Sequence, residues 1–343
     1  MKALVLQEIK RLALTEVAVP APGADEVLIR TMASTICTSD LNDIDHNPFG
    51  TVLPQIIGHE GAGIVAAVGS EVKGFAVGDR VTAHPVVPCM DCASCLRGLF
   101  HLCDEMDHLG ITMGGTFAEH FLMRADRVRR IPEGMSFPVA TLMEPVCVCL
   151  EAVERANVGE GSNVLVIGDG PFGVMIAKIC AAKRPKRIVF VGRHEYRLGQ
   201  VPTGGLYTAL NEKKSEDIVA DILNATEGEG IDSAILAVGN ARAVEICIEA
   251  LRSRGTLSVF SGIMGKVPVD LWKLHVKELH ICGSCNDMDC LDEALVLLAD
   301  ESLGLSKLIS HEFPFAQWEQ AFDMAANGKD GALKVSVVME EKP

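Results

Sequence analysis

The stretch Asn163-Val-Leu-Val-Ile-Gly168-Asp-Gly170-Pro171-Phe172-Gly173 decides the fold of the second half of this chain. An apolar strand leads into a G-x-G-x-x-G turn, and a helix-forming run begins at Pro171. This order is typical of a dinucleotide-binding turn, in which the glycines permit the tight turn, the approach of a pyrophosphate and close helix packing. The helix N-terminus then faces the anion. The residues expected to line this site are Gly168, Gly170, Pro171, Phe172 and Gly173.

Downstream of this turn, apolar runs alternate with helical patterns. The apolar runs are Val164–Ile167, Ile188–Val191, Ala234–Val238 and Leu257–Phe260, and the helical patterns are Val174–Ala182 and Ala241–Leu251. Alternation at this period predicts an α/β fold with a doubly wound parallel sheet. Ligands bind at the carboxyl ends of the strands in such sheets. The residues expected beside the nicotinamide are therefore Val238, Gly239, Phe260, Ser261 and Gly262.

The end of the second strand, Val191-Gly192-Arg193-His194-Glu195, bears on which dinucleotide binds. An NAD site places Asp or Glu there for the ribose 2′-hydroxyl, whereas an NADP site needs room and a cation for the 2′-phosphate. Gly192 removes bulk, and Arg193 supplies a planar, permanently charged group suited to phosphate, with help from His194 and Arg197. These residues favour NADP. The alternative is that Glu195 reaches back to a 2′-hydroxyl while Arg193 is merely solvated.

Residues 1 to about 130 have a different, β-rich pattern. Their short alternating runs are Lys2–Leu6, Glu26–Thr31, Gly61–Val68 and Phe117–Met123. Separated by Gly, Pro and Asp turns, these runs predict an antiparallel, barrel-like domain. The chain ends on two helical patterns and a strand, at Leu291–Leu298, Ala316–Ala326 and Leu333–Val338. We expect this tail to pack on the first domain, which makes the dinucleotide domain an insertion.

Four cysteines lie close together in Cys89-Met-Asp-Cys92-Ala-Ser-Cys95-Leu-Arg-Gly-Leu-Phe-His-Leu-Cys103. Two C-x2-C steps and a fourth thiol suit a closed tetrahedral zinc site, which is structural because it leaves no open position. Disulfides are the alternative. The chain opens Met-Lys-Ala-Leu-Val-Leu without a charged-then-apolar leader, so we expect a cytoplasmic protein in which thiols stay reduced.

Three further segments carry metal-capable side chains. Cys37-Thr-Ser39-Asp40 and Gly58-His59-Glu60 are expected in loops next to strands, and Met143-Glu144-Pro145 lies in an apolar helical stretch. Cys, His and carboxylate are the ligands of an open, catalytic zinc, whose fourth position takes water or a substrate oxygen. Each segment alone is weak evidence. Together with a four-cysteine cluster and a nucleotide fold, they predict a second zinc site.

The composition limits the partners of the protein. The chain has 343 residues, 48% hydrophobic residues and a formal net charge of −15. This charge disfavours nucleic acid and anionic membrane surfaces as partners. The longest apolar runs fall well short of the roughly 20 residues that a membrane span needs. We expect a small-molecule substrate.

The chain resembles the zinc-dependent medium-chain dehydrogenases/reductases, the alcohol and polyol dehydrogenase superfamily. The matching motifs, in the order of that family, are Cys37-Thr-Ser-Asp40, Gly58-His-Glu-Gly-Ala-Gly-Ile-Val, Gly78-Asp-Arg-Val81, the cysteine cluster and the Gly168 turn. Glu144-Pro145 stands where other alcohol dehydrogenases carry a cysteine, which resembles the sorbitol, sugar-acid and threonine dehydrogenase branch. The resemblance implies a GroES-like catalytic domain over 1–146 and 289–343, with a Rossmann domain over 147–288.

The resemblance also implies roles for individual residues. Cys37, His59 and either Glu60 or Glu144 would bind a catalytic zinc, with the other glutamate binding directly, through water or only during turnover. Asp40 would accept a hydrogen bond from His59, and Ser39 would begin a proton relay from the substrate oxygen. Cys89, Cys92, Cys95 and Cys103 would hold the second, structural zinc. The family further suggests a homo-oligomer, either tetramer or dimer.

The chain departs from the family after the second strand. Gly199-Gln-Val-Pro202-Thr-Gly204-Gly205 replaces a helical pattern and should interrupt the helix. That leaves the contacts to ribose and adenine open.

The polar segment Asn42-Asp43-Ile-Asp45-His46-Asn47 suits a polyol, sugar or sugar-acid substrate, although a solvated loop would look the same. L-Threonine or a simple secondary alcohol is the alternative substrate. A non-catalytic nucleotide-binding scaffold and a zinc-free quinone reductase are disfavoured, because neither needs Cys37, His59, Glu60 and Glu144 together.

Overall fold

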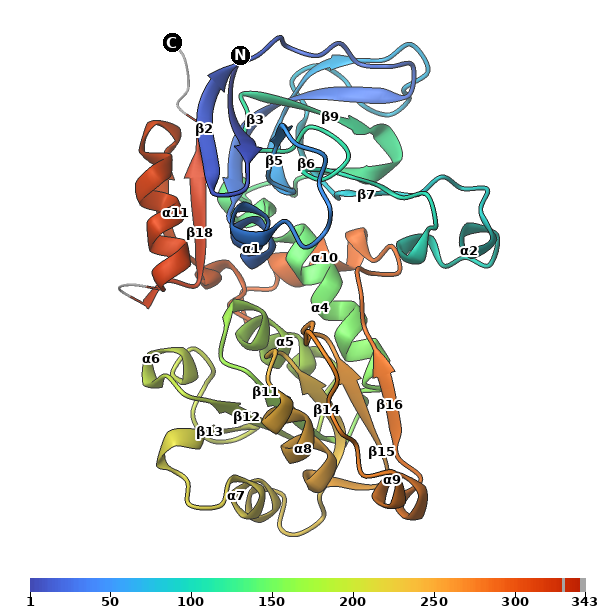
Figure 1. The fold of residues 1–343 in the computed structure, drawn as a ribbon, viewed down its shortest axis with the longest axis vertical. Helices are drawn as coiled ribbons and strands as arrows, with labels where there is room; N and C mark the ends of the chain where they lie inside the picture. Colours follow the sequence, from blue (N-terminus) through green and yellow to red (C-terminus); the bar gives the residue numbers. More distant parts are fainter. Residues whose placement is uncertain (329–330, 340–343) are drawn as a thin grey trace. The chain divides into compact units, whose positions relative to one another are not determined.

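The computed structural model describes residues 1–328 and 331–339 (Figure 1). The chain forms two compact units. The first comprises residues 1–147, 288–301 and 306–343, and the second comprises residues 148–287 and 302–305. The tail of the chain lies in the first unit. Among the described residues, no helix is both long and apolar enough to cross a membrane.

The second unit is built on a sheet of six parallel strands within the described residues, in the order β13-β12-β11-β14-β15-β16. The strands are β11 (Asn163–Ile167), β12 (Arg187–Gly192), β13 (Tyr207–Asn211), β14 (Ile231–Leu236), β15 (Leu251–Val259) and β16 (His280–Gly283). The strand order reverses between β11 and β14. A crevice for a ligand forms outside the carboxyl ends of the strands at such a point. The prediction of a doubly wound parallel sheet is confirmed.

Helices between these strands bury the apolar faces of the sheet. They are α5 (Pro171–Ala182), α6 (Glu195–Leu198), α7 (Ile218–Ala225), α8 (Ala241–Ala250) and α9 (Leu271–Lys277). A cluster of buried side chains that includes Leu165, Val189 and Ile246 fills the space between sheet and helices. Helix α6 ends at Leu198, directly before the Gly- and Pro-rich run that was expected to interrupt it.

The first unit is mostly antiparallel. Its main sheet has the order β10-β6-β5-β3-β18-β17, with β9 paired to β3. The strands of this unit are β1 (Lys2–Glu8), β2 (Arg11–Glu16), β3 (Glu26–Thr35), β4 (Gln55–Ile56), β5 (Glu60–Val68), β6 (Arg80–Ala83), β7 (Val86–Val87), β8 (Asp107–His108), β9 (His120–Arg124), β10 (Val128–Arg130), β17 (Ile309–Pro314) and β18 (Lys334–Val338). Strand β18 pairs antiparallel with β3, so the tail is part of the sheet.

Helices of the first unit lie at strand ends and in the tail. They are α1 (Thr38–His46), α2 (Ala93–Leu96), α3 (Phe137–Ala140), α4 (Met143–Arg155, which continues into the second unit), α10 (Leu291–Ala299) and α11 (Trp318–Asn327). The expectation that Ser39 and Asp40 lie in a loop was wrong, because both belong to the first turn of α1. The Asp40 carboxylate accepts a 2.8 Å hydrogen bond from the Cys37 backbone N–H, which satisfies a donor at the start of the helix.

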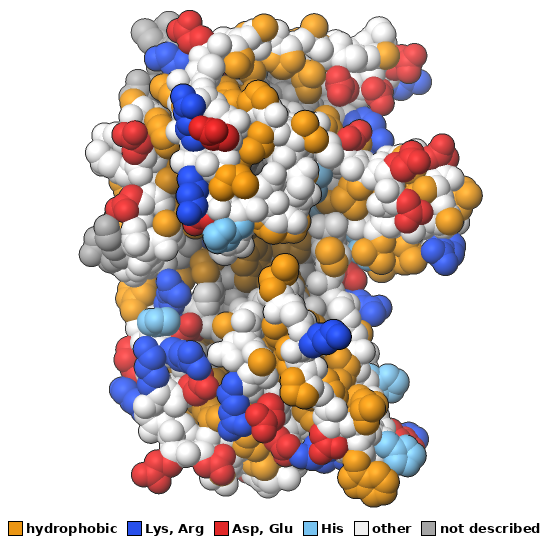
Figure 2. Space-filling view, in the orientation of Figure 1, with side chains coloured by type: hydrophobic (Ala, Val, Ile, Leu, Met, Phe, Trp, Pro, Cys, Tyr) orange, Lys and Arg blue, Asp and Glu red, His pale blue; other side chains and the backbone are white. Residues whose placement is uncertain are grey.

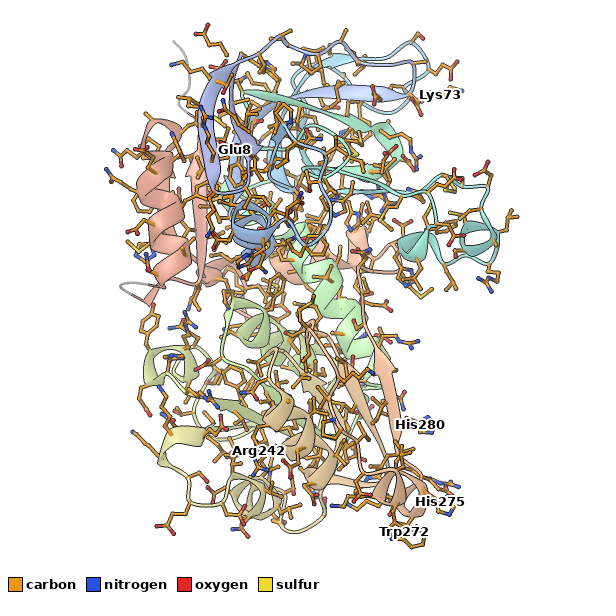
Figure 3. All side chains as sticks on the ribbon, viewed as in Figure 1. Glu8, Lys73, Arg242, Trp272, His275 and His280 are labelled. Atoms are coloured by element: carbon orange, nitrogen blue, oxygen red, sulfur yellow. The ribbon has the colours of Figure 1, made fainter. Side chains whose placement is uncertain are left out.

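Two surface features of the second unit bear on ligands and partners. Lys and Arg side chains gather over the region of α6 and β13 (Figure 2). Trp272 and His275 project outward from α9, and their rings lie 6.0 Å apart (Figure 3). The strand that pairs with β15 at this edge of the sheet, β16, has mostly exposed residues.

Candidate zinc and nucleotide sites

Strand pairing in the first unit brings Cys37, His59 and Glu60 together. Thr35, at the end of β3, pairs with Glu60, at the start of β5, so the residues that follow β3 and precede β5 meet at one sheet end. The potential ligand atoms of Cys37, His59 and Glu60 all lie within 4.8 Å of one another, and all three residues are buried. Cys, His and carboxylate donors at this spacing fit an open zinc site.

Glu144 is buried in the first turn of α4. Among the described residues, the 4.8 Å group around Cys37 does not include it. The charge of Glu144 still acts on the buried ion pair, because it helps to raise the pKa of Lys334. The two glutamates that the sequence left as alternatives are therefore placed differently, with Glu60 inside the group and Glu144 outside it.

Asp40 orients the metal-capable histidine. One oxygen of its carboxylate lies 3.2 Å from Nδ1 of His59, while the other accepts the Cys37 N–H. A proton on Nδ1 leaves Nε2 as the metal-binding nitrogen, the arrangement that carboxylate–histidine pairs support at metal sites. The hydroxyl of Ser39 lies 3.4 Å from that Nε2. Ser39 therefore lies beside the nitrogen of His59 that is available to a metal.

The charge of His59 depends on its neighbours. Burial alone would lower its pKa, but the Asp40 carboxylate and then Cys37 outweigh burial, so the pKa of His59 lies well above 6.5. A metal must bind the neutral imidazole. Zinc therefore competes with a proton for His59, and zinc binding should release protons.

Glu60 is also part of a buried ion pair that sequence patterns did not reveal. Its Oε1 accepts from Nζ of Lys334 on β18, and its Oε2 accepts from the Thr35 hydroxyl. The side chains of Lys334 and Glu60 are 2% and 0% exposed. Burial would lower the pKa of Lys334, but Glu60 and Cys37 raise it above its ordinary value. Lys334 is therefore a cation, and it offsets one of the carboxylates near the site.

His108 and Asp43 complete the surroundings of His59. The rings of His108 and His59 lie 5.7 Å apart, and burial followed by repulsion from His59 lowers the pKa of His108 to about 3. His108 donates from Nδ1 to the carbonyl of Leu109 at 2.7 Å. Asp43 on α1 is buried, and burial together with the charge of Asp40 raises its pKa to about 6. A neutral His108 and a titrating Asp43 thus lie near the same histidine.

The polar segment from Asn42 to Asn47 contains some groups that stabilise the local structure and others that are exposed to solvent. Asn47 exchanges hydrogen bonds with Thr51, at 2.9 Å and 2.7 Å, and so holds its own loop. Asn42, Asp45 and His46 are exposed or nearly so. Asp43 is the buried acid of the segment.

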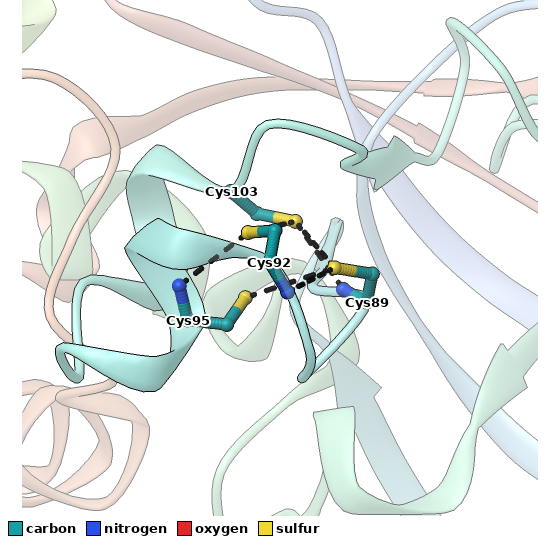
Figure 4. A group of neighbouring side chains, drawn as sticks. All are labelled: Cys89, Cys92, Cys95 and Cys103. Atoms are coloured by element: carbon teal, nitrogen blue, oxygen red, sulfur yellow. Dashed lines mark hydrogen bonds between the residues drawn. The ribbon is translucent and has the colours of Figure 1, made fainter.

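The four cysteines surround a common centre (Figure 4). The Sγ–Sγ distances of Cys89 to Cys95, Cys92 to Cys103 and Cys103 to Cys89 are 4.0, 3.8 and 3.4 Å. Sulfurs bound to one tetrahedral zinc at about 2.3 Å would be about 3.8 Å apart. The backbone N–H of Cys95 is the main group that lowers the pKa of the Cys92 thiol, to about 7. All four cysteines are free of disulfides, so spacing and geometry fit the structural zinc site.

The glycine turn has the geometry that a pyrophosphate requires. Gly168 has φ +121°, and a side chain there would meet the Ala237 carbonyl at 2.5 Å. A Cβ on Gly173 would lie 1.7 Å from the Gly168 carbonyl, whereas one on Gly170 would meet nothing within 4 Å. Gly173 is thus needed for helix packing, and Gly170 leaves open space in front of α5. These are the separate roles of glycines in a dinucleotide-binding turn.

The residues expected at the nicotinamide end lie close together. Phe260 and Ser261 donate backbone N–H bonds of 3.2 and 2.9 Å to the Leu236 carbonyl, so the loops after β14 and β15 run side by side. A Cβ on Gly239 would lie 2.9 Å from the Gly262 carbonyl. The ring of Phe260 packs 5.3 Å from that of Phe172 at the start of α5. The structure therefore joins these loops to the glycine turn.

Comparison with known proteins identifies the family of the chain. Residues 23–133 match the alcohol dehydrogenase GroES-like domain, and residues 170–300 match the zinc-binding dehydrogenase family. The chain is 30% identical to sorbitol dehydrogenase of Bacillus subtilis over 342 residues, which cover 98% of this chain and 97% of that protein. The chain belongs to the zinc-dependent medium-chain dehydrogenase/reductase family. The dehydrogenase is an oxidoreductase of alcohols or polyols that uses zinc and a nicotinamide cofactor.

Other relatives are similar over nearly the whole dehydrogenase. L-Threonine 3-dehydrogenase of Pyrococcus furiosus is 31% identical over 327 residues, 93% of each chain. A zinc-binding dehydrogenase structure from Sinorhizobium meliloti, bound to NADP, has a TM-score of 0.91 and 25% identity, with 98% of each chain covered. An Escherichia coli short chain alcohol dehydrogenase complexed with NADH has a TM-score of 0.90 and 25% identity, with 98% and 99% covered.

The end of β12 in the dehydrogenase differs from the sequence interpretation in one respect. A Cβ on Gly192 would lie 2.4 Å from the Cβ of Asp169, so the room that Gly192 leaves is filled by Asp169 and not held open for a phosphate. The Arg193 side chain is half exposed, and its Nε donates to Glu212 at 2.7 Å. The Glu195 carboxylate binds Lys214 at 2.9 Å and accepts a hydrogen bond from Asn211.

Several functional candidates were not found from the sequence. Lys334, Asp169 and His108 carried no motif signal, because each gains its importance from a partner far away in the chain. A buried lysine could have been suspected from the apolar strand Leu333–Val338, where a charge needs a partner. Arg197 lies in α6, next to the predicted phosphate-binding residues.

Proposed function

We propose that this dehydrogenase oxidises a secondary alcohol of a polyol, sugar or sugar acid to the ketone, with NADP in preference to NAD. The observation that carries the proposal is the buried group of Cys37, His59 and Glu60, with Ser39 3.4 Å from His59. Cys37, His59 and one of Glu60 and Glu144 would hold the catalytic zinc. When bound, zinc supplies a Lewis acid for the substrate oxygen.

The remaining steps fall to the side chains and the cofactor. Ser39 would take the hydroxyl proton of the alcohol. A nicotinamide held beside Val238, Gly239 and Phe260 would supply the hydride acceptor for the carbinol carbon, so the products would be ketone, reduced cofactor and a proton. Asp40 keeps His59 in the tautomer that presents Nε2 to the metal. Reduction of the ketone runs the same steps in reverse.

Asp43 supports a hydroxyl-rich substrate. A buried carboxyl group one helical turn after Ser39 can accept a hydrogen bond from a second hydroxyl. A simple apolar alcohol has no group to offer it. Relatives named sorbitol dehydrogenase support the polyol class, and those named L-threonine 3-dehydrogenase make L-threonine the competing substrate.

The preference for NADP rests on the charges at the end of β12. Arg193 and His194 are both exposed there, in the region of α6 and β13 over which basic side chains gather (Figure 2). β12 itself ends on Gly192 and not on an acid, and the nearby Asp169 carboxylate is already bonded to the N–H groups of Arg193 and His194. The relatives bind both cofactors, one NADP and one NADH.

The proposal also includes two zinc ions per chain and a separate role for each of the two units. The GroES-like unit would be the catalytic domain, with the four cysteines holding its structural zinc, and the Rossmann unit would bind the dinucleotide. A cytoplasmic location stays a prediction from the sequence.

A homo-oligomer, dimer or tetramer, is also proposed. The side chains of Met264, Leu271 and Trp272 are 93%, 71% and 73% exposed on the second unit, and Trp272 projects outward (Figure 3). Leu271 and Trp272 are neighbours in α9, and contiguous exposed apolar side chains mark protein interfaces. Sedimentation velocity of the wild type and of Trp272→Ala tests this, since a monomeric wild type contradicts it.

Initial rates test the substrate and cofactor together. Polyols, aldonates and L-threonine would each be assayed with NADP and NAD in the zinc-loaded protein. We expect the highest kcat/KM for a polyol or aldonate with NADP. Cys37→Ser should abolish turnover while leaving cofactor binding intact. A large preference for NAD rejects the cofactor assignment, and a preference for L-threonine rejects the substrate class.

A further inference from the structure

Asp169, which lies between the first two glycines of the glycine turn, organises the end of the neighbouring strand β12. Its Oδ2 accepts hydrogen bonds from the backbone N–H groups of Arg193 and His194, both at 2.7 Å. The same oxygen lies 3.0 Å from Nδ1 of His194. Asp169 is only 8% exposed, so it lies beneath the turn that it holds.

Gly192 is the residue that makes this arrangement possible. Its missing side chain leaves the space that Asp169 occupies, because a Cβ there would approach the Asp169 side chain to 2.4 Å. The backbone of the two elements is tied together by the Gly168 N–H, which donates to the Val191 carbonyl at 2.9 Å. The glycine turn and the end of β12 therefore form one unit, with Asp169 as the link.

This link determines which groups the turn can offer to a ligand. Asp169 already accepts the backbone N–H groups of Arg193 and His194. The end of β12 therefore presents the side chains of these two residues to a ligand, and not their backbone donors. With Nδ1 of His194 donating to Asp169, its Nε2 is turned away from that carboxylate. The side chains of His194 and Arg193 are 54% and 46% exposed. Both can reach an anion in solvent.

We propose that Asp169 is a positioning residue for the adenosine 2′-phosphate, holding Arg193 and His194 as the pair that binds it. The proposal rests on the proposed preference for NADP. It deepens that preference, because it assigns the selectivity to an acid of the glycine turn that the phosphate does not touch.

The charge of Asp169 is compatible with a nearby phosphate. Three donors converge on its Oδ2, and the side chain is buried, so its charge is largely offset before any ligand arrives. The other acid near the site is Glu212, which pairs with Arg193 at 2.7 Å. A 2′-phosphate would replace Glu212 as the partner of Arg193. The opposite role, in which Asp169 itself accepts the ribose 2′-hydroxyl of NAD, is an outcome of the test.

The test uses cofactor fragments that need neither zinc nor substrate. The affinities of the full-length protein for 2′,5′-ADP and 5′-AMP would be measured by isothermal titration calorimetry for the wild type, Asp169→Asn and Asp169→Ala. The matched control is Asp217→Ala, because Asp217 also accepts two backbone N–H bonds, both 3.1 Å, at the start of α7 in the same unit. Melting temperatures establish that each variant is folded.

We expect the wild type to bind 2′,5′-ADP at least about tenfold more tightly than 5′-AMP, as charge-assisted phosphate contacts predict. Asp169→Ala should reduce this ratio to about threefold or less, with 5′-AMP affinity nearly unchanged, and Asp169→Asn should fall between. The Asp217 control should keep the wild-type ratio.

Two outcomes overturn the inference alone: a folded Asp169→Ala or Asp169→Asn variant that keeps the wild-type ratio, or one in which the ratio rises. The second outcome would identify Asp169 as a ribose-binding acid. A wild type without preference for 2′,5′-ADP overturns the NADP proposal itself. The two failures are thus distinguished by the wild-type measurement.

Discussion

Lys334 and Glu60 form a buried ion pair that joins the last strand of the chain to the candidate zinc site. Their side chains are 2% and 0% exposed, and 274 positions separate them in the sequence. Since Glu60 also accepts the Thr35 hydroxyl, both of its oxygens are held by the protein. A metal bound by Glu60 would share a carboxylate oxygen with one of these donors, so the coordination of Glu60 depends on Lys334 and Thr35.

Replacing Lys334 by Met should therefore destabilise the protein strongly. An uncompensated buried carboxylate costs about 3–5 kcal/mol. The double variant Lys334→Met with Glu60→Gln should recover much of that loss, because no lone charge remains. Urea unfolding of the zinc-free protein gives the coupling energy, with Lys334→Arg as the charge-conserving control. Additive effects of the two single changes would contradict the pair.

Zinc affinity at the Cys37 group should fall steeply as the pH is lowered. The Asp40 carboxylate and Cys37 outweigh burial and raise the pKa of His59 well above 6.5, so a proton competes with zinc for the imidazole at higher pH than at an ordinary histidine. In the zinc-free protein, the stability from protonated His59 is present below its unfolded pKa and is lost as pH rises through the folded one. Asp40→Asn should lower that pKa and flatten the pH dependence. Competition with a chelator at several pH values measures both, and an unchanged profile in Asp40→Asn contradicts the assignment.

Asp43→Asn should stabilise the zinc-free protein while impairing catalysis. The folded pKa of Asp43 is about 6, above the ordinary carboxyl value, so its contribution to stability decreases as pH rises from about 4 to about 6. Removing the charge should add about 1–3 kcal/mol at pH 7. kcat/KM for a polyol should fall about tenfold or more if Asp43 binds a hydroxyl. Unfolding curves and kinetics together check this prediction, which fails if stability rises without a kinetic effect.

Two glycines of the nucleotide turn should respond differently to alanine. A Cβ on Gly170 meets nothing within 4 Å, so Gly170→Ala should leave the melting temperature nearly unchanged and yet block the approach of the pyrophosphate. A Cβ on Gly173 would lie 1.7 Å from the Gly168 carbonyl, so Gly173→Ala should destabilise the fold itself. Thermal melts of both variants measure the loss of stability, and NADP titrations measure the loss of cofactor binding. Tight cofactor binding by Gly170→Ala would argue against this site.

Metal analysis should give two zinc ions per chain. Cys37→Ser should reduce the count to one and abolish activity, with little loss of global stability. Cys103→Ser should also leave one ion, but it should destabilise the loop that the four cysteines hold, because structural zinc supplies folding energy. Elemental analysis with limited proteolysis distinguishes the two variants. A wild type with one zinc would reject one of the sites.

Local patterns predicted most of the fold. The parallel sheet followed from apolar runs such as Val164–Ile167, whose period and length depend on the chain segment alone. The interruption of α6 followed from Pro202 and the nearby glycines for the same reason. The start of α1 was missed, because the residue type of Asp40 permits both a loop and a helix start, and only its bond to the Cys37 N–H decides between them.

The sequence by itself determined the chemistry available: the Gly168 turn, the four clustered cysteines, and the donor set of Cys37, His59 and Glu60. Each is defined by residue type and short spacing. Only the tertiary structure decided how those groups are held. It paired Glu60 with Lys334 and placed Asp169 beneath the turn at Arg193 and His194. Such contacts join segments that no local period relates, because strand pairing and burial bring them together only when the whole chain folds.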